Sequence, residues 1–369
     1  MILIKKFYQI FKILFITFIF SLVIDYFFGS KILKSFDPLF AKSQFYERLI
    51  RIDHPIYHHT LRENVQYSNN VSFIETYELC TNNHGFKSEC NKVDDKNYEF
   101  AFIGDSFTEG TPIEYQDSFV GIFAKETKYK TANLGIVSYS PKIYLSKINY
   151  LIQQGFKFNN VVVFIDISDF YDDTNFYSIN EEFVVTEKYS KRKNLKRRKF
   201  LRNNFPLTNF YMFVLKKYKF KKEKPIELNE SLKPVFTDKV NLKAKWTYSK
   251  TDKIDGYDLG VKEGNQIMVK HMEELYKILL KKNIKLSLAV YPWPHQLKND
   301  VIESLHVSIW RDFCINKCEK FINYFPIFFE EMNNTSFLDI YKKYFFKNDP
   351  HFNKIGHKIL ADKLIQEFK

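Results

Sequence analysis

The first pattern along the chain is an almost wholly apolar run from Phe7 to Phe28, with Lys12 and Asp25 near its ends. A membrane-spanning helix needs about 20 such residues, whereas the core helix of a soluble protein normally keeps a polar stripe. Lysines precede the run, and no small-residue cleavage site follows it. We therefore expect residues 1–29 to form an uncleaved transmembrane signal anchor with a cytoplasmic amino terminus, a buried core helix being the weaker alternative.

After the anchor, residues 30–95 mix apolar and polar positions without long periodic runs, and we interpret them as a lead-in segment with some strand character. From residue 96 onward, short apolar runs alternate with helical spacing. The expected strands are Tyr98–Ile103, Thr131–Leu134, Val161–Ile165 and Leu286–Val290. The expected helices carry Phe119, Val120, Phe123 and Ala124 after an Asp117 cap, then Met268, Met272, Leu275 and Leu279, and finally Ile355, Ile359 and Leu364. This alternation predicts an α/β three-layer sandwich with a mostly parallel central sheet, whose active site lies at the carboxyl ends of the strands.

Residues 175 to about 260 interrupt this rhythm, and we interpret them as a basic insertion or cap beside the sheet. The formal net charge of the chain is +13. The densest basic cluster comprises Lys191, Arg192, Lys193, Lys196, Arg197, Arg198, Lys199 and Arg202. A solvated loop is the ordinary interpretation of such a cluster, and anionic lipid head groups or an acidic glycan are the alternatives. The anchor argues against nucleic acid as a partner.

The four cysteines fall into two local pairs, which is compatible with disulfides in an exported chain. Cys80 and Cys90 flank a turn-like stretch, so we expect them to be bridged. Cys314 and Cys318 are four residues apart and are either reduced or locally bridged. The sequence contains no metal-ligand spacing, P-loop or dinucleotide fingerprint, and it therefore implies no metal and no cofactor.

The candidate chemistry lies near the two ends of the α/β pattern. Gly104-Asp105-Ser106 directly follows the first expected strand, where a strand-to-helix turn exposes the serine hydroxyl and directs its N–H toward a developing oxyanion. Asp349-Pro350-His351 precedes the last helix and supplies a base and an orienting carboxylate. In a strand-like segment, residues two apart point the same way, so Asp349 and His351 can both face Ser106.

Two of these segments resemble blocks of a known family. Ala101–Gly110 (AFIGDSFTEG) resembles the first block of the SGNH (GDSL-type) hydrolase superfamily, and NDPHFNKIGH resembles its last block. The resemblance covers about residue 96 to the carboxyl terminus, apart from the insertion. It implies an SGNH, flavodoxin-like fold for residues 96–369 and a serine esterase mechanism. Ser106 would be the nucleophile, His351 the general base and Asp349 the orienting acid.

The middle blocks depart from the family. Asn133–Ser138 resembles the second block, and the family's oxyanion-hole glycine falls on Ser138. Asp166–Asp169 resembles the third block, and the family's oxyanion asparagine falls on Ser168. Removing one oxyanion donor typically costs about 10²–10³ in rate. Three interpretations of the second departure are open: Ser168 substitutes for the asparagine, another donor does, or the enzyme is slow.

The acid also departs, because the commonest family pattern places an aspartate where this chain has Asn348. Its D-x-H form resembles the alginate-type polysaccharide O-acetyltransferase branch. Two functions are therefore open. One is a membrane-anchored esterase or O-acyltransferase acting on a cell-envelope glycan. The other is a catalytically weak or inactive glycan-binding or assembly protein on the same fold.

Further residues near the expected strand ends are candidates for substrate contact. They are Asp105, Trp293, which could stack on a sugar ring, and His295. His84 lies in a segment that resembles one seen ahead of the G-D-S block in exported relatives, and His357 is expected to be structural. The expected location is the bacterial inner membrane, with one span, the catalytic domain on the periplasmic side and a carbohydrate or acyl-ester substrate.

Overall fold

The computed structural model describes residues 2–36, 50–71, 76–188, 197, 200–220, 235–236 and 238–369. The chain divides into two compact units. The smaller unit comprises Met1–Arg48 and Tyr189–Ile226, and the larger comprises Leu49–Lys188 and Glu227–Lys369.

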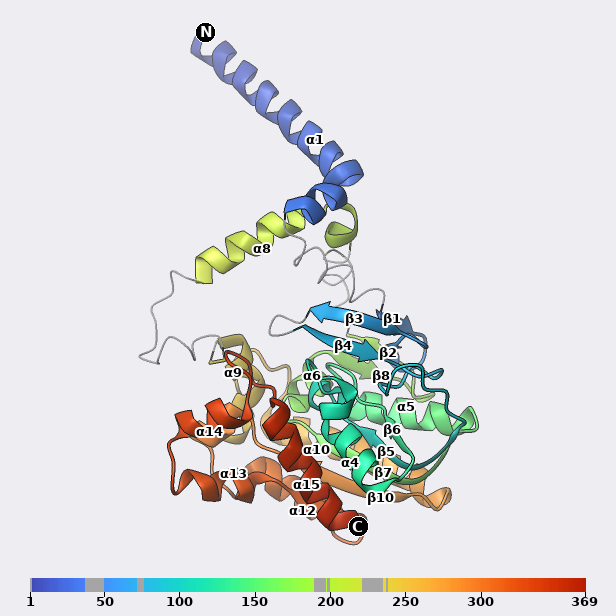
Figure 1. Ribbon diagram of the computed structural model, residues 1–369. Coiled ribbons are helices and arrows are strands. Elements are labelled where there is room, and N and C mark those ends of the chain that lie inside the picture. The colour runs from blue at the N-terminus through green and yellow to red at the C-terminus, as the bar shows by residue number, and fades with distance from the viewer. Residues whose placement is uncertain are drawn as a thin grey trace. The chain divides into compact units, whose positions relative to one another are not determined.

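The larger unit is built on a five-stranded sheet in the order β11-β10-β7-β5-β6, in which all neighbouring strands are parallel (Figure 1). The strands are β5 (Asn97–Ile103), β6 (Thr131–Asn133), β7 (Lys157–Ile165), β10 (Lys285–Val290) and β11 (Lys320–Asn323). Counted along the chain, this is the flavodoxin-like order 2-1-3-4-5. The predicted parallel α/β sheet is confirmed, and β11 is an additional strand that the apolar pattern did not predict.

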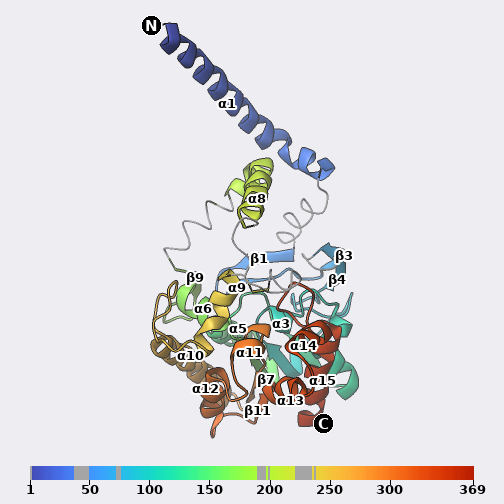
Figure 2. The ribbon, with the colours of Figure 1, turned by 90° about the vertical axis from the view of Figure 1, so that its left-hand side faces the viewer.

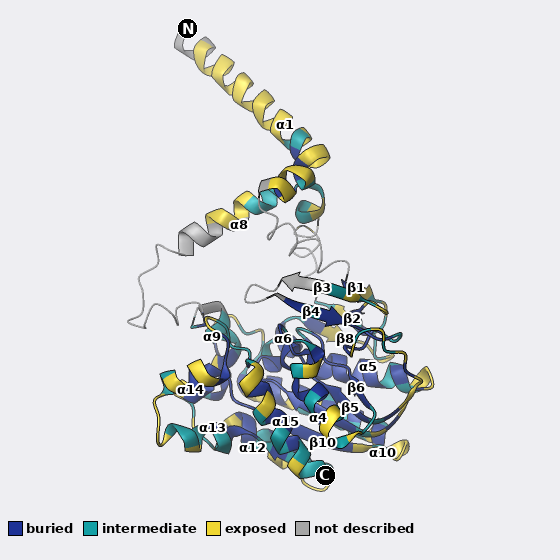
Figure 3. Cartoon of the chain, in the orientation of Figure 1, coloured by how far each residue is buried: buried dark blue, intermediate teal, exposed yellow. Residues whose placement is uncertain are grey.

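Helices cover both faces of this sheet, because its strands are apolar on both sides. Every residue of Val161–Ile165 in β7 is fully buried. Helix α4 (Phe119–Thr127) packs against α15 (Lys354–Phe368), and α5 (Pro141–Gln153) packs against α10 (Val261–Lys281). Figure 2 shows the sheet between these two groups of helices, and Figure 3 shows the buried residues concentrated in and beside the strands. The three-layer arrangement is as predicted.

The start of α4 differs from the prediction. Asp117 ends a short 3₁₀ helix, η1 (Tyr115–Asp117), and the cap of α4 is Ser118. The Ser118 hydroxyl accepts a hydrogen bond from the backbone N–H of Gly121 at 3.2 Å. Serine and aspartate are both good caps, and the extra 3₁₀ turn decides between them by placing Ser118 in the extended conformation that a cap needs.

The other helices of the larger unit are short. They are α3 (Ser106–Glu109), α6 (Asp169–Asn175), α9 (Asp238–Ala244), η3 (Lys245–Thr247), α11 (Pro294–Asn299), α12 (Leu305–Cys314), α13 (Phe325–Met332) and α14 (Phe337–Tyr344). Several of them directly follow central strands, and they bring the chain to the edge of the sheet where the strands end.

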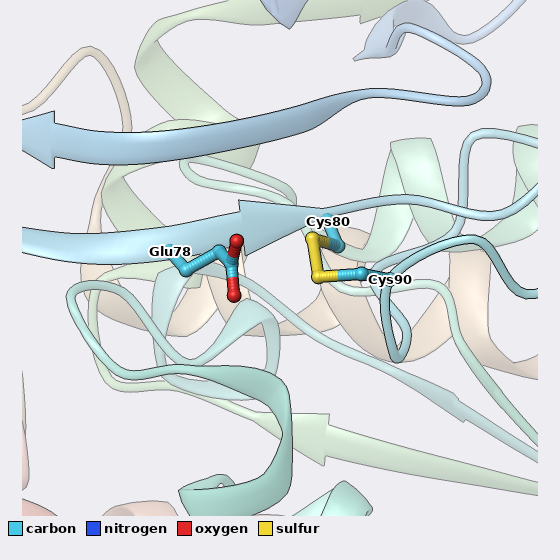
Figure 4. Close-up of side chains that lie close together, drawn as sticks. All are labelled: Glu78, Cys80 and Cys90. Atoms are coloured by element: carbon cyan, nitrogen blue, oxygen red, sulfur yellow. A yellow bond between two sulfur atoms is a disulfide. The ribbon is translucent and has the colours of Figure 1, made fainter.

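The lead-in segment forms two antiparallel hairpins. In one, β1 (Arg51–His54) pairs with β2 (His58–Leu61), and in the other β3 (Gln66–Val71) pairs with β4 (Thr76–Cys80). The predicted Cys80–Cys90 disulfide is present, with Cα atoms 4.9 Å apart. Figure 4 shows Glu78 beside this disulfide, whose sulfur atoms are already bonded to each other and therefore offer no thiolate for a metal. Cys314 and Cys318 are also bridged.

The basic insertion does not form a single body. Its first part makes a small hairpin in the larger unit, in which β8 (Tyr177–Ile179) pairs with β9 (Val185–Glu187). Its middle part, Tyr189–Ile226, belongs to the smaller unit. None of its described residues supplies a strand of the central sheet. Of the basic cluster, Arg197 and Arg202 are described, and the other members lie outside the described residues.

The smaller unit contains the amino-terminal helix α1 (Ile2–Phe36) and helix α8 (Pro206–Phe220). Residues Lys6–Ser35 of α1 are long and apolar enough to cross a membrane, and none of the most apolar stretch is buried within the protein. This observation is compatible with a membrane anchor and equally with a signal sequence.

Candidate active site

The expected site residues come from loops at one edge of the sheet. Ser106 follows β5, Ser138 lies in the loop after β6, Ser168 follows β7 and Trp293 follows β10. The carboxyl ends of parallel strands meet at one edge, and ligands bind there where the strand order reverses. In this sheet the strand order reverses between β5 and β7. Ser106 follows β5 and therefore lies at the position that the topology favours for a site.

The Ser106 turn is held by its two preceding residues. A Cβ on Gly104 would lie 2.2 Å from the Thr108 hydroxyl and 2.8 Å from the Phe164 carbonyl oxygen, so only glycine fits there. Asp105 caps the short helix α3 by accepting the backbone N–H of Phe107 at 2.9 Å. Its other carboxylate oxygen lies 3.2 Å from the Ser106 hydroxyl. Asp105 is therefore part of the turn that presents Ser106, and only 2% of it is exposed.

His351 lies beside Ser106 although 245 positions separate them in the sequence. Its Nε2 is 2.7 Å from Ser106 Oγ, and its Nδ1 is 2.5 Å from Asp349 Oδ1. An ionised carboxylate only accepts hydrogen bonds, so Nδ1 carries the proton and Nε2 is the acceptor toward the serine. The Phe107 ring stacks on the imidazole, with centroids 4.5 Å apart.

The backbone conformation that aligns Asp349 with His351 differs from the expected strand. The segment is a bend, in which Asp349 Oδ1 also accepts the backbone N–H of His351 at 2.9 Å. A bridge between Phe345 and Phe352 closes the loop, and Asn348 adopts a left-handed conformation with φ of 65°. One carboxylate oxygen thus holds both the backbone and the ring of His351, which a strand would not achieve.

The electrostatics of this pair favour an ion-pair-like arrangement. Burial by itself lowers the pKa of His351, but the carboxylates around it, Asp349 first and then Asp105 and Asp166, together outweigh burial, and the net shift is upward. Burial raises the pKa of Asp349, but His351 outweighs that effect, and the net shift is downward. Asp349 is therefore ionised at neutral pH and stabilises a proton on His351.

Three buried carboxylates lie behind the serine turn: Asp105, Asp166 and Asp169. Burial, followed by repulsion from Asp166, raises the pKa of Asp105 to about 8, and burial also raises the pKa of Asp166 and Asp169. Their oxygens lie within 4.8 Å of one another, as those of cation ligands could. However, Trp293 Nε1 donates to Asp166 and Tyr144 donates its hydroxyl to Asp169, so these carboxylates already have protein donors.

The loop after β6 packs directly on the serine turn. Gly135 is required there, because a Cβ would lie 2.7 Å from the backbone nitrogen of Glu109. The N–H of Ile136 donates to the carbonyl of Gly104 at 3.3 Å. Ser138 has a φ of 63°, a left-handed conformation that glycine adopts more readily than serine. Tyr177 donates its hydroxyl to the Ser138 carbonyl at 2.9 Å.

The remaining candidates are buried. The backbone N–H of Ser168 donates to Asp166 Oδ1 at 2.6 Å, and the residue is 3% exposed. Trp293 is 5% exposed, and His295 is fully buried beside Phe236, at a centroid distance of 4.6 Å. Little of the Trp293 face is open for stacking on a sugar, and its indole N–H is engaged by Asp166.

His84 and His357 have local partners. His84 Nε2 lies 2.9 Å from the carbonyl oxygen of Asp94. His357 Nδ1 accepts the backbone N–H of Phe119 at 3.2 Å, so this ring joins α15 to the start of α4. The structural role expected for His357 agrees with this contact.

Sequence reasoning did not identify a group of residues that hold the loop after β6. Glu109 Oε2 accepts two hydrogen bonds, one from Arg51 Nη1 at 2.7 Å and one from the backbone N–H of Val137 at 2.9 Å. His59 Nε2 lies 2.9 Å from the Val137 carbonyl oxygen. Arg51 and His59 come from the lead-in segment, whose sequence carries no motif for them. Glu109 lies within AFIGDSFTEG, and a carboxylate three residues after the candidate nucleophile was the available signal.

Comparisons with known proteins give similarity only at the level of structure. No family model and no curated protein matches the chain. It is similar to a lipolytic G-D-S-L family member from Veillonella parvula at 10% identity, covering 73% of this chain and 97% of that chain with a TM-score of 0.38. It is also similar to a mutant acetylxylan esterase from Geobacillus stearothermophilus at 12% identity, covering 73% of this chain and 93% of that chain with a TM-score of 0.39. A third similar structure is an esterase from Pseudoalteromonas at 9% identity, covering 74% of this chain and 96% of that chain with a TM-score of 0.34.

Proposed function

We propose that this protein is a membrane-anchored serine esterase or O-acyltransferase of the SGNH type that acts on an acyl ester of a cell-envelope glycan or a similar substrate. The observation that carries the proposal is the hydrogen-bonded series Ser106 Oγ, His351 and Asp349, with distances of 2.7 Å and 2.5 Å. Nucleophile, base and orienting acid in this relation are the arrangement by which a serine is activated.

The first half-reaction follows from the geometry. His351 Nε2 takes the hydroxyl proton as Ser106 Oγ bonds to the acyl carbonyl carbon. Asp349 stabilises the resulting imidazolium through Nδ1. His351 then gives the proton to the departing alkoxide, and the acyl group stays on Ser106. Water or a sugar hydroxyl repeats the steps in reverse and releases an acid or an acylated sugar.

The oxyanion formed in these steps needs hydrogen-bond donors. We assign this role to the backbone N–H groups of Ser106 and Ser138, with the Ser168 hydroxyl as a third donor. The packing of the loop after β6 on the serine turn supports the first two. Such preorganised donors are typically worth about 10²–10³ each in rate.

The proposed location follows from α1 and the disulfides. A helix with the length and composition of a span at the amino terminus supports a single-pass anchor. Two disulfides support an oxidising compartment, because cytosolic thiols are normally kept reduced. We therefore place the larger unit on the periplasmic side of a bacterial inner membrane.

The choice of a glycan and of acyl transfer rests on the D-x-H spacing of Asp349 and His351, which resembles polysaccharide O-acetyltransferases. Hydrolysis and transfer share the acyl-enzyme, so the structure of the triad does not separate them. The two reactions differ in the acceptor, water or a sugar hydroxyl, which reacts only in the second half-reaction.

One observation favours a second candidate function, a non-catalytic glycan-binding or assembly protein. Ser168 stands where the family has its oxyanion asparagine. The serine side chain is shorter than that of asparagine, and Ser168 is only 3% exposed. A site that has lost this donor would bind esters or glycans and turn them over slowly or not at all.

A fluorophosphonate probe distinguishes the two functions. The full-length protein in detergent is incubated with the probe, and the modified residue is found by mass spectrometry. We expect labelling at Ser106, and loss of labelling in Ser106→Ala. Ser178→Ala, at an exposed position in β8, is the matched control. An unlabelled but folded wild type would rule out the serine mechanism and favour the binding function.

A second assay separates hydrolysis from transfer. Wild-type protein that has been acetylated with a simple acetyl ester is divided between buffer alone and buffer with a neutral oligosaccharide. Acetate release in both indicates a hydrolase, whereas acetylated oligosaccharide at the expense of acetate indicates a transferase.

A further inference from the structure

Helix α8 is attached to the carboxyl-terminal part of α1 by one carboxylate. Asp25, which is 3% exposed, accepts the backbone N–H groups of Leu207 and Thr208, each at 2.8 Å. It also accepts the Thr208 hydroxyl at 2.6 Å. The first N–H groups of a helix lack intrahelical partners, and a carboxylate satisfies both their hydrogen bonds and the positive end of the helix dipole. A charged residue near the end of an apolar span therefore has a defined partner.

Packing reinforces this attachment. Leu33 of α1 is buried against Leu207 and Phe210 of α8. A Cβ on Gly29 would lie 3.0 Å from Pro206 Cγ, so the glycine permits the close approach of the two helices. These contacts fix the beginning of α8 to one end of the candidate span.

The apolar surface of α8 extends beyond what α1 covers. Tyr211, Met212, Val214 and Leu215 have exposed fractions of 62%, 37%, 42% and 44%. At 100° per residue they continue the apolar arc that begins with Leu207 and Phe210. Soluble proteins rarely leave a contiguous apolar patch of this kind uncovered. Figure 3 shows most of α1 as exposed too, apart from positions in its carboxyl-terminal part.

Charge indicates what covers the patch. Between Lys191 and Lys224 the sequence contains 14 Lys and Arg residues and one acidic residue, Glu223. An exposed apolar helix face flanked by basic residues is the composition of helices that lie in a membrane interface. There the apolar face enters the acyl boundary and the cations meet anionic head groups. A basic flank without the apolar face would fit other anions equally well.

We infer that α8 is an interfacial membrane helix that binds anionic phospholipid in the same bilayer that α1 crosses, and that Asp25 positions it there. This inference rests on the proposed membrane anchor. It gives the middle of the insertion a function of its own, because residues 189–226 then attach the protein to the lipid surface at a second place.

The test uses a nitroxide label on the full-length protein in vesicles of phosphatidylcholine with phosphatidylglycerol. All four native cysteines are paired, so a single introduced thiol is labelled selectively. Met212→Cys reports on α8, and Val301→Cys, at a position 60% exposed in the larger unit, is the water-exposed control. Power-saturation measurements compare access to oxygen, which concentrates in lipid, with access to a water-soluble nickel chelate.

We expect a several-fold higher oxygen-to-nickel ratio at Met212 than at Val301, and a lower ratio when phosphatidylglycerol is omitted. Asp25→Ala should bring the Met212 ratio toward that of Val301 while the protein stays in the membrane fraction after alkaline extraction. Equal ratios at the two sites would overturn the inference. A Met212 label that neither reagent reaches would overturn it in favour of a protein partner. Release of the wild type by alkaline extraction would contradict the anchor itself, and this inference with it.

Discussion

The carboxylate of Glu109 accepts a hydrogen bond from the backbone N–H of Val137 at 2.9 Å, which joins the serine turn to the loop that carries Ser138. The partner of Glu109 on its other side is Arg51, and His59 Nε2 lies 2.9 Å from the Val137 carbonyl oxygen. Burial lowers the pKa of His59 to about 3, so its ring is neutral and one nitrogen can donate to that carbonyl. Both peptide groups of Val137 are therefore held, and the residue that follows adopts φ of 63°.

Glu109→Gln should lower kcat by about 10- to 100-fold with little change in KM, because a displaced oxyanion donor costs part of its contribution to the rate. The amide of glutamine presents an N–H group where one of the two donors, Arg51 or Val137, now points. Steady-state kinetics with an acetyl ester measure the effect. Glu126→Gln, at an exposed position, should behave as the wild type. A folded Glu109→Gln protein with unchanged kcat would contradict a role for Glu109 in positioning this loop.

The pH dependence of the reaction should reflect the raised pKa of His351. The base must be neutral, so kcat/KM rises with pH as His351 loses its proton, and this limb should lie above the ordinary value of 6.5. Asp349→Asn removes the main upward influence on the pKa, so the limb should move to lower pH while the plateau falls by up to about 10⁴-fold. Asp362→Asn, on the surface of α15, is the control. A limb that does not move in Asp349→Asn would show that Asp349 does not control the base.

Ser168→Asn should raise kcat if Ser168 occupies the oxyanion position, because the amide N–H of asparagine reaches farther than the serine hydroxyl as a hydrogen-bond donor. An increase of about 10-fold or more is expected from the usual value of one such donor. Ser178→Asn provides the matched control on an exposed strand. An unchanged or lower kcat in folded Ser168→Asn would place the third donor elsewhere.

The two disulfides should differ in their contribution to stability. Cys80–Cys90 spans 10 positions and Cys314–Cys318 spans 4. A longer loop loses more unfolded-state entropy on closure, so replacing the first pair by serines should cost about 3 kcal/mol and the second about 2 kcal/mol. Urea unfolding of the two double variants in detergent measures the difference. A larger loss for the second pair would contradict the loop-entropy account.

The sequence determined the architecture of the larger unit because its strands are buried on both faces. A run such as Val161–Ile165 has no other environment available to it, and the helical spacing between such runs requires a parallel sheet covered on both sides. The grouping of Ser106, Asp349 and His351 could also be predicted, because each lies in a short contiguous segment at the end of an element. The Cys80–Cys90 bridge could be predicted for the same reason, since a turn alone brings these residues together.

Only the tertiary structure decided the relations between segments with no local pattern. The sequence shows Asp25 only as a charged residue near the end of an apolar run. That its carboxylate caps α8 depends on Leu207 and Thr208, which are 182 and 183 positions away. Arg51 and His59 reach the loop of Val137 through a lead-in that shows neither period nor motif. The common orientation of Asp349 and His351 arises from a bend closed by one carboxylate oxygen, where spacing alone suggested a strand. Hydrogen bonds of this kind leave no periodicity in a sequence, because each depends on where the fold brings two distant groups together.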